Sequence, residues 1–348
     1  METSLAALPK IELHDHLDGG LRPSTILALA RSDGVRLPTT DERELARLLS
    51  PGPSSLEIYL QAFAVTVSVL QTAHALRRAA TEAVEDWHRD GVVDGEIRFA
   101  PELHTDKGLS METVVEAVLL GLEDGRRTTG VDSGLILCSM RHAKPTVATA
   151  RLVRRYREDG VVGFDIAGAE SGNRATAHRD AFEYCAEHLL AATCHAGEVT
   201  DPSYIRDALV ACRALRIGHG TQLIQEWGPE RLLPPEGSLT RWILDRQIPL
   251  EICLSSNLQT KASPSAAEHP FELFRRTGLA VTLNTDNRLV SATTLTGELD
   301  LARTTWSLSG DELLALQRTA LDAAFCAAEI KTRIRAKYFS EDADSMRV

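Results

Sequence analysis

The sequence contains no apolar run close to the ~20 residues that a membrane-spanning helix requires. Its first ten residues, METSLAALPK, lack the basic segment and the long apolar core of a secretory signal. Basic residues are also outnumbered, because 38 Lys and Arg face 49 Asp and Glu and leave a formal net charge of −11. This acidic excess argues against a nucleic acid or an anionic membrane surface as the partner. We therefore predict a cytoplasmic protein that acts on a small molecule.

Several signature motifs are missing, and each absence removes a class of protein. The six cysteines are scattered without a C-x-x-C pair and are interpreted as reduced core thiols, which excludes a cysteine zinc site and the cytidine-deaminase signature. No G-x-G-x-x-G or G-x-x-x-x-G-K-[ST] follows an early strand, which argues against dinucleotide and P-loop folds. The G-x-S-x-G of serine hydrolases is also missing. Any metal must then be held by histidine and carboxylate groups.

Short apolar segments alternate along the chain with longer segments of helical periodicity. Eight such repeats favour an α/β fold of the TIM type, a closed (β/α)8 barrel, over a six-stranded open sheet. We expect a single domain over residues 1–348. The expected strands span residues 11–16, 95–102, 134–140, 161–168, 190–198, 215–220, 248–257 and 279–287.

The interval between the first two expected strands is much longer than one crossover helix needs. Residues from about 24 to 90 have a helical pattern, so we predict a helical insertion after the first strand. Insertions at the carboxyl end of a barrel strand lie over the active-site mouth, and part of this segment is expected to form a lid. An alternative that does not exclude the lid is packing of these helices against the barrel flank.

The stretch IELHDH places His14 and His16 one residue apart at the end of an apolar strand. Residues i and i+2 of an extended strand point to the same side, so the two imidazoles form a pair of potential metal ligands. The alternative interpretation is a pair of half-exposed histidines near a turn.

Polar side chains also follow the apolar part of the later expected strands. These residues are His195, Glu198, His219, Asn257, Asp286 and Asn287. Each one alone has an ordinary structural explanation, such as a helix cap or a turn. In a barrel, however, the carboxyl ends of all strands converge on one face, where barrel enzymes have their active sites. The joint pattern therefore predicts an active site.

Three imidazoles and one carboxylate from these strand ends suit a catalytic zinc ion, with Fe²⁺, Co²⁺ or Mn²⁺ as alternatives. The predicted ligands of one ion per chain are His14, His16, His195 and Asp286. Zinc would lower the pKa of a bound water from 15.7 towards ~7. Glu198 is a candidate general acid, and His219 could orient or deprotonate the attacking water. Such a set is suited to hydrolytic attack on an sp² carbon.

The order and spacing of these motifs resemble the adenosine deaminase family of metal-dependent amidohydrolase-type barrels. The matching segments are PKIELHDHLDGGLRP, VVGFDIAGAE, CHAGE, RIGHG, SSN and NTD, and the resemblance extends from about Pro9 to the last helices. It implies hydrolytic removal of the 6-amino group of a purine nucleoside, adenosine or 2′-deoxyadenosine, with release of ammonia. It also implies the same four zinc ligands, proton donation by Glu198 to purine N1, and positioning of the water by His219.

Other positions acquire a role only through this resemblance. Asp18 would contact the ribose 5′-hydroxyl, whereas relatives that act on free adenine tend to carry Glu there. Gly168 would donate its backbone N–H to purine N3, and His16 would lie against the substrate as well as the metal. The apolar lid over the ligand would consist of Leu56, Tyr59, Leu60 and Phe63.

Three departures from the family pattern leave alternatives open. Asn287 replaces the second aspartate that contacts purine N7, but its carboxamide NH₂ can donate to N7 directly. Leu254 replaces a usual proline and residues 199–201 replace small ones, so the sugar is not defined. One alternative is a deaminase of a modified 6-aminopurine nucleoside, such as aminofutalosine, S-adenosylhomocysteine or a nucleoside-antibiotic intermediate. Another is a catalytically silent barrel that binds nucleosides or a protein. The sequence gives no prediction of oligomeric state.

Overall fold

Eight parallel strands form the centre of the computed structural model, which describes residues 4–50, 52–227 and 233–340. Residues 1–3 and 341–348, at the ends of the expected domain, and residue 51, within the expected insertion, lie outside these ranges. The eight expected strands are confirmed, most of them shorter than expected. They are β1 Lys10–His16, β2 Val92–Phe99, β3 Asp132–Met140, β4 Val161–Ala167, β5 Thr193–Ala196, β6 Arg216–His219, β7 Leu250–Ile252 and β8 Val281–Leu283.

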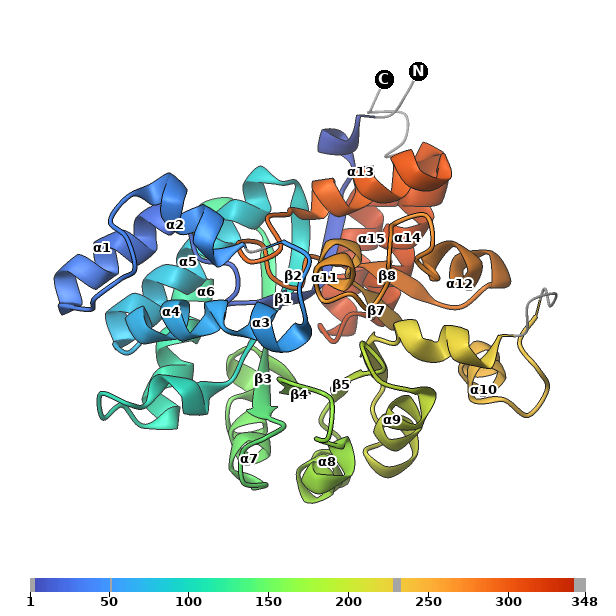
Figure 1. Ribbon diagram of the computed structural model, residues 1–348, viewed down its shortest axis with the longest axis horizontal. Coiled ribbons are helices and arrows are strands. Elements are labelled where there is room, and N and C mark those ends of the chain that lie inside the picture. Colours follow the sequence, from blue (N-terminus) through green and yellow to red (C-terminus); the bar gives the residue numbers. More distant parts are fainter. Residues whose placement is uncertain (1–3, 51, 228–232, 341–348) are drawn as a thin grey trace.

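The strands close into the TIM-type barrel that the alternating pattern predicts (Figure 1). Hydrogen bonds define two sheets, β1 to β4 and β5 to β8, each in sequence order. Single bridges join the sheets, one between Phe164 and Ala192 and one between Asp15 and Asp286. At the second bridge, the Asp286 N–H donates to the carbonyl oxygen of His14 at 2.7 Å, and the His16 N–H donates to that of Asp286 at 2.7 Å.

The expected strand 248–257 is wrong in its second half. β7 ends at Ile252, and residues Leu254–Gln259 form the helix α11. Asn257 therefore lies on a helix and not at a strand end. An apolar run that continues through Leu254 cannot by itself distinguish a strand from the start of a buried helix. In this helix, Ser256 is hydrogen-bonded to Asp286 and Asn257 to His219.

Helices surround the barrel and follow local sequence signals. Thr72 caps the N-terminus of α5 and Ser110 that of α6, and Gly130 ends α6 with φ of 77°. The outer helices are α5 Ala73–Arg89, α6 Met111–Thr129, α7 Ala148–Arg155, α8 Arg179–Glu187, α9 Pro202–Arg206, α10 Leu239–Arg246, α12 Phe271–Thr277, α13 Leu295–Trp306, α14 Gly310–Ala323 and α15 Ala328–Tyr338. Short 3-10 helices occur at Leu5–Ala7, Pro101–His104, Arg157–Asp159, Ala175–His178 and Thr221–Glu226, and a π-helix at Asp207–Ala211.

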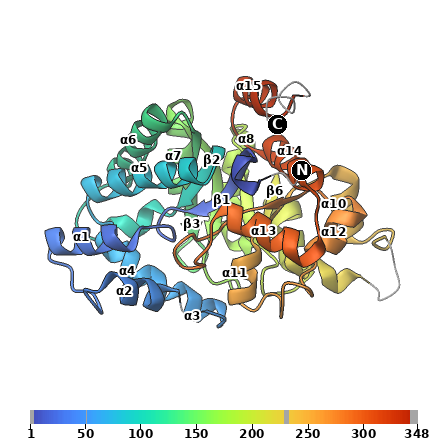
Figure 2. The same ribbon diagram turned by 90° about the horizontal axis from the view of Figure 1, so that it is seen from above.

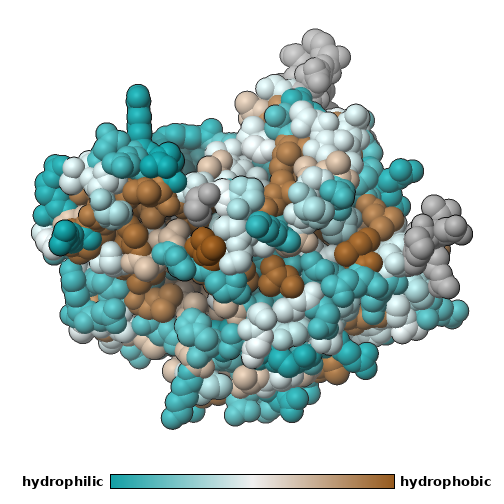
Figure 3. All heavy atoms as spheres, in the orientation of Figure 1, coloured by the Kyte–Doolittle hydropathy of each residue, from teal (hydrophilic) through white to brown (hydrophobic). Residues whose placement is uncertain are grey.

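Helices α1 Pro23–Asp33, α2 Glu42–Leu49, α3 Leu56–Leu60 and α4 Ala62–Val69 occupy the segment between β1 and α5. Figure 2 shows α2, α3, α4 and α11 on the same side of the barrel, and in Figure 1 α3 and α11 lie in front of the strands. Apolar side chains gather on this face over the end of the molecule that carries α1 to α4 (Figure 3). The segment thus lies where a lid over the barrel mouth is expected.

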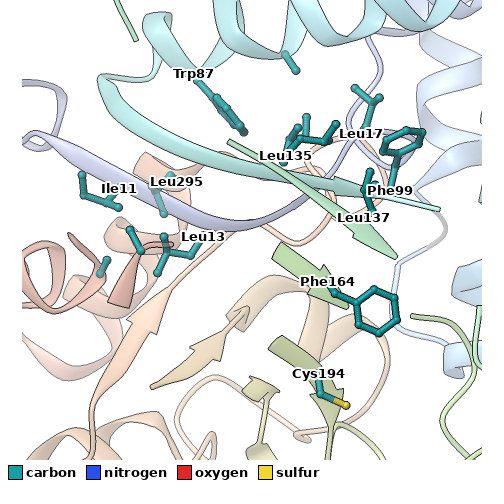
Figure 4. Packing of buried hydrophobic residues seen from close by; sticks show 14 of the residues in the cluster. Ile11, Leu13, Leu17, Trp87, Phe99, Leu135, Leu137, Phe164, Cys194 and Leu295 are labelled. Atoms are coloured by element: carbon teal, nitrogen blue, oxygen red, sulfur yellow. The ribbon is translucent and has the colours of Figure 1, made fainter. Parts of the chain in front are cut away.

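Side chains alternate along the strands between an apolar outer layer and a polar interior. Ile11, Leu13 and Leu135 belong to the apolar layer between the strands and the helices, together with Trp87 of α5 (Figure 4). The interior contains buried ion pairs instead, among them Arg98 with Asp165 at 2.8 Å. All six cysteines are free thiols, five of them buried, as expected for core residues. Across the described ranges, no helix has both the length and the apolar character needed to span a bilayer.

Candidate metal centre and active site

Four side chains from opposite parts of the barrel converge at its carboxyl end. The Nε2 atom of His195 lies 3.0 Å from Nε2 of His14 and 3.2 Å from Nε2 of His16. The Asp286 Oδ1 atom lies 3.5 Å from Nε2 of His14 and 3.4 Å from Nε2 of His16. All four potential ligand atoms lie within 4.8 Å of one another. The structure thus brings together the four residues that the sequence predicts as metal ligands.

The outer nitrogens of two of these imidazoles are held by buried carboxylates. His14 Nδ1 lies 2.8 Å from Glu251 Oε2, and His195 Nδ1 lies 2.9 Å from Asp165 Oδ2. A proton on Nδ1 leaves the lone pair on Nε2, so both lone pairs point into the cluster. Histidines that bind metals typically have such a carboxylate partner. Three closely spaced imidazole nitrogens cannot all hydrogen-bond to one another, and a divalent cation fits this donor set.

The two carboxylates are kept ionised by buried arginines. Burial alone would raise the pKa of Asp165, but the adjacent His195 and Arg98 hold it below its ordinary value. Burial opposes ionisation of Glu251 too, yet Arg98 and Arg216 keep its pKa well below the usual range. Arg98 donates to Glu251 Oε2 at 2.9 Å and Arg216 donates to Oε1 at 2.6 Å. The carboxylates that hold His14 and His195 are therefore negatively charged and are paired with buried arginines.

A pocket with a cavity volume of about 230 Å³ lies next to the four ligands. All other predicted site residues except Asn257 line it, whereas His14 lies behind it and is fully buried. The predicted residues that line the pocket are His16, Asp18, Leu56, Tyr59, Leu60, Phe63, Gly168, His195, Glu198, His219, Asp286 and Asn287. No Lys or Arg belongs to the lining within the described ranges.

Glu198 is held in the pocket by the turn after β5. Gly197 adopts a φ of 65°, and a Cβ there would approach Ile205 to 2.3 Å, so glycine is needed at the turn. Glu170 accepts hydrogen bonds from the backbone N–H groups of Gly197 and Glu198 at 2.5 and 3.1 Å. Burial, reinforced by the nearby Asp286, raises the pKa of Glu198 to about 8. Its side chain is therefore protonated at neutral pH and suited to donate a proton.

His219 and Asp286 both adopt left-handed backbone conformations, with φ of 65° and 58°. Such conformations are uncommon for residues other than glycine and concentrate at functional sites. His219 Nε2 lies 3.8 Å from Glu198 Oε2, and Asp286 Oδ2 accepts a hydrogen bond of 2.5 Å from Ser256 Oγ. Burial lowers the pKa of His219 to about 4, which keeps the ring neutral.

Next to the ligand Asp286, hydrogen bonds connect helix α3 with the loop after β8. Asn287 Nδ2 donates to the Tyr59 hydroxyl at 2.8 Å, and that hydroxyl lies 2.7 Å from Ser291 Oγ. Gly19 packs against Asn287, since a Cβ at Gly19 would lie 1.8 Å from Asn287 Oδ1. Asn287 Oδ1 has no hydrogen-bond partner in the described part of the chain. One N–H of the Asn287 amide thus holds Tyr59, which leaves the amide a second N–H that can donate.

Several residues of the site were not predicted from the sequence. Met140 and His142, at the end of β3 and just beyond it, line the pocket, as do Ala100, Leu103 and Cys138. The supporting carboxylates Asp165 and Glu251 were also missed. A signal for both existed in the sequence, because each is an isolated acidic residue within an otherwise apolar strand, in VVGFDIAG and PLEIC.

The site can be compared with known proteins. A family model described as "Adenosine deaminase" matches residues 9–339. A protein of Mycobacterium avium (strain 104) named "Adenosine deaminase" is 44% identical over 330 residues, which are 91% of this chain and 90% of that protein. The crystal structure of an adenine deaminase from Arthrobacter aurescens is similar with a TM-score of 0.85 and 26% identity, covering 96% and 98% of the two chains. An Arabidopsis N6-mAMP deaminase is similar with a TM-score of 0.81 and 30% identity, covering 96% and 98%.

Proposed function

The chain belongs to the adenosine deaminase family, and we propose that it hydrolyses adenosine or 2′-deoxyadenosine to the corresponding inosine and ammonia. The observation that carries this proposal is the convergence of the His14, His16, His195 and Asp286 ligand atoms beside the buried Glu198, whose pKa burial raises to about 8. A hydrolytic deamination needs an activated water at an amidine carbon and a proton donor at the neighbouring ring nitrogen.

We propose Zn²⁺ as the metal, with one ion per chain, held by the Nε2 atoms of the three histidines and by Asp286. Zinc, when bound, supplies Lewis acidity that lowers the pKa of a water molecule. The histidine and carboxylate donors, with outer carboxylates on two of the imidazoles, suit this ion. No cysteine belongs to this group of four, although the buried thiol of Cys253 lies within 4.8 Å of potential ligand atoms of His219 and Asp286.

The remaining steps depend on side chains of this chain. Glu198 donates its proton to purine N1 as the water oxygen bonds to C6, and His219 lies next to the same oxygen. The C6–N6 bond then breaks, and the amino group leaves as ammonia with one of the two protons that the water gives up, while the other restores the proton of Glu198. The backbone N–H of Gly168 donates to N3, and the free N–H of Asn287 donates to N7. Leu56, Tyr59, Leu60 and Phe63 cover the base and exclude bulk water.

The pocket favours a nucleoside over a nucleotide. Asp18 is buried, and its Oδ1 has no hydrogen-bond partner among the described residues, so it can accept a hydrogen bond from the ribose 5′-hydroxyl. A 5′-phosphate would meet this carboxyl group and find no arginine or lysine in the described lining. The N6-mAMP deaminase and the adenine deaminase among the relatives act on a nucleotide and a free base. We propose that the substrate of this chain, a nucleoside, is larger than a free base and smaller than a nucleotide.

The test is a steady-state assay of ammonia release from adenosine, 2′-deoxyadenosine, adenosine 5′-monophosphate, adenine and S-adenosylhomocysteine, before and after removal of the metal by a chelator. We expect the highest kcat/KM for the first two, loss of activity after chelation and recovery with zinc. Full activity after complete metal removal would overturn the zinc mechanism. A higher kcat/KM for a modified nucleoside would replace adenosine as the substrate.

The proposal includes a single barrel domain over the described chain and a cytoplasmic location. The location rests on the cysteine chemistry, because six unpaired thiols are typical of a reducing compartment.

A further inference from the structure

Behind His219, away from the pocket, a continuous row of hydrogen bonds leads through two buried side chains to one backbone amide. The Phe271 N–H donates to His269 Nδ1 at 3.1 Å. His269 Nε2 lies 3.2 Å from Asn257 Oδ1, and Asn257 Nδ2 lies 3.1 Å from His219 Nδ1. Asn257 is 0%, His219 1% and His269 3% exposed, so water does not replace these contacts. We call the pair Asn257 and His269 the relay.

The direction of every hydrogen bond in the row follows from its first member. A backbone N–H can only donate, so His269 Nδ1 must accept. Burial lowers the pKa of His269 to about 3, so the ring is neutral and its one proton is on Nε2. That N–H needs an acceptor, which fixes the Asn257 oxygen towards His269. The Asn257 NH₂ group then faces His219 and donates to Nδ1.

We propose that Asn257 and His269 are positioning residues that keep the proton of His219 on Nε2, the nitrogen that faces the pocket. His219 Nε2 lies 3.8 Å from Glu198 Oε2, on the side where the reacting atoms bind. His219 therefore offers an N–H to the attacking oxygen and has no free lone pair with which to remove a proton from it. Of the two roles that the sequence leaves open, orienting the water is the one that this row of hydrogen bonds supports.

The alternative arrangement of protons is unfavourable for a structural reason. A proton on His219 Nδ1 would face the Asn257 NH₂ group, and rotating the amide would place that NH₂ against the His269 N–H. Each choice brings two donors together in a site closed to water, where unsatisfied donors are costly. Removing this contact between two donors would require the proton of His269 to move to Nδ1, and the ring would then lose its hydrogen bond from the Phe271 backbone N–H. The backbone N–H of Phe271, which does not titrate, therefore fixes the direction of all the hydrogen bonds in the row.

The direct test is the tautomer of His219 in the zinc-loaded wild-type enzyme labelled with ¹⁵N-histidine. Two-bond ¹H–¹⁵N correlation spectra distinguish a protonated Nε2 from a protonated Nδ1, and His219→Gln identifies the signals by their loss. We expect His219 to carry its proton on Nε2. A proton on Nδ1 in the wild-type protein would overturn the proposal without any variant that must fold.

The second arm uses the relay itself. His269→Phe removes the donor to Asn257 and should give a mixture of His219 tautomers, with kcat lower by roughly ten- to a hundredfold and KM nearly unchanged. His269→Gln keeps an N–H towards Asn257 and an oxygen towards Phe271, and should restore both the tautomer and most of kcat. His178→Phe is the matched control, because it removes another buried histidine, which contacts Arg141 and not the relay. An unchanged His219 tautomer in His269→Phe would contradict the relay.

The kinetic arm rests on the proposed deaminase function, whereas the tautomer arm does not. If the wild-type enzyme releases no ammonia from adenosine but His219 carries its proton on Nε2, the substrate assignment fails and the relay stands. If the enzyme is active and the proton is on Nδ1, the relay fails and the proposed function stands.

Discussion

Glu251 accepts a hydrogen bond of 2.8 Å from Nδ1 of His14, and both side chains are fully buried. The same carboxylate accepts from Arg98 and Arg216 at 2.9 and 2.6 Å, so one acidic residue fixes a predicted metal ligand and neutralises two interior cations. Both the stability of the barrel and the proposed binding of the metal should therefore depend on Glu251.

Glu251→Gln should therefore impair both properties. We expect the free energy of unfolding to fall by about 3–5 kcal/mol, because two buried guanidinium groups lose a charged partner. Zinc affinity should fall by about 10- to 100-fold, since His14 loses the carboxylate that orients it. Urea unfolding and zinc competition with a chromogenic chelator measure the two effects. Glu123→Gln, which breaks an exposed pair with Arg126, should change stability by less than about 1 kcal/mol.

Glu198→Gln should retain zinc and lose activity. The amide has nearly the shape of the protonated carboxyl group, but it cannot give a proton to N1. A loss of kcat by about 10²–10⁴-fold is expected for a missing general acid. Metal content is measured by elemental analysis and turnover by ammonia release. Wild-type turnover in a zinc-loaded Glu198→Gln enzyme would remove this residue from the mechanism.

Asn287 should make the enzyme sensitive to the atom at position 7 of the purine. In 7-deazaadenosine a C–H replaces N7, so the Asn287 N–H loses its acceptor, and kcat/KM should be roughly tenfold below that of adenosine. Asn287→Leu should reduce kcat/KM for adenosine and bring the two substrates close together. Tyr59→Phe removes the other partner of the amide and should preserve the preference. Equal kcat/KM for the two nucleosides in the wild-type enzyme would show that Asn287 makes no contact with N7.

Asp94 should make stability depend on pH at a place far from the active site. Burial, with smaller contributions from Glu96 and Asp132, raises the pKa of Asp94 to about 7, whereas an unfolded aspartate has a value near 3.9. The folded state thus holds a proton that the unfolded state has lost, and stability from this group decreases as pH rises from about 4 to 7. Relative to Asp94→Asn, the wild type should lose about 2–3 kcal/mol between about pH 5 and pH 8.

Denaturant unfolding of both proteins at several pH values measures this difference. Asp94 accepts from the Cys326 thiol at 3.5 Å, a bond that an asparagine oxygen can also accept. A stability difference that does not change with pH would indicate that Asp94 is already ionised in the native protein.

Much of the barrel was predictable because each strand repeats the same local pattern. Apolar residues such as Ile11 and Leu13 alternate with interior groups, and polar residues follow at the end. The metal ligands were predictable for the same reason, since closure of the barrel brings strand ends together whatever their distance in sequence. Asn257 was misplaced on a strand because a short buried helix and a buried strand share the same apolar composition.

The supporting shell was not predictable, because its pairs depend on distance in the fold and not on spacing in the chain. Arg98 and Glu251 are 153 residues apart, and Asn257 meets His219 from a different element. Resemblance to a family supplied roles for Asp18, Gly168 and the lid, and the structure brings them to one pocket. The resemblance does not predict the relay of Asn257 and His269, because the relay depends on where the backbone N–H of Phe271 lies in the fold.

Strand pairing between the two halves of the barrel, β1 to β4 and β5 to β8, is limited to single bridges within the described chain, although buried ion pairs such as Arg98 with Glu251 also join the halves. His14 and His16 belong to the first half, whereas His195 and Asp286 belong to the second. An ion held by these four residues would therefore link the two halves at the carboxyl end of the barrel. Loss of that ion would then remove one link between the halves at this rim, whereas buried ion pairs such as Arg216 with Glu96 would still join them further along the barrel.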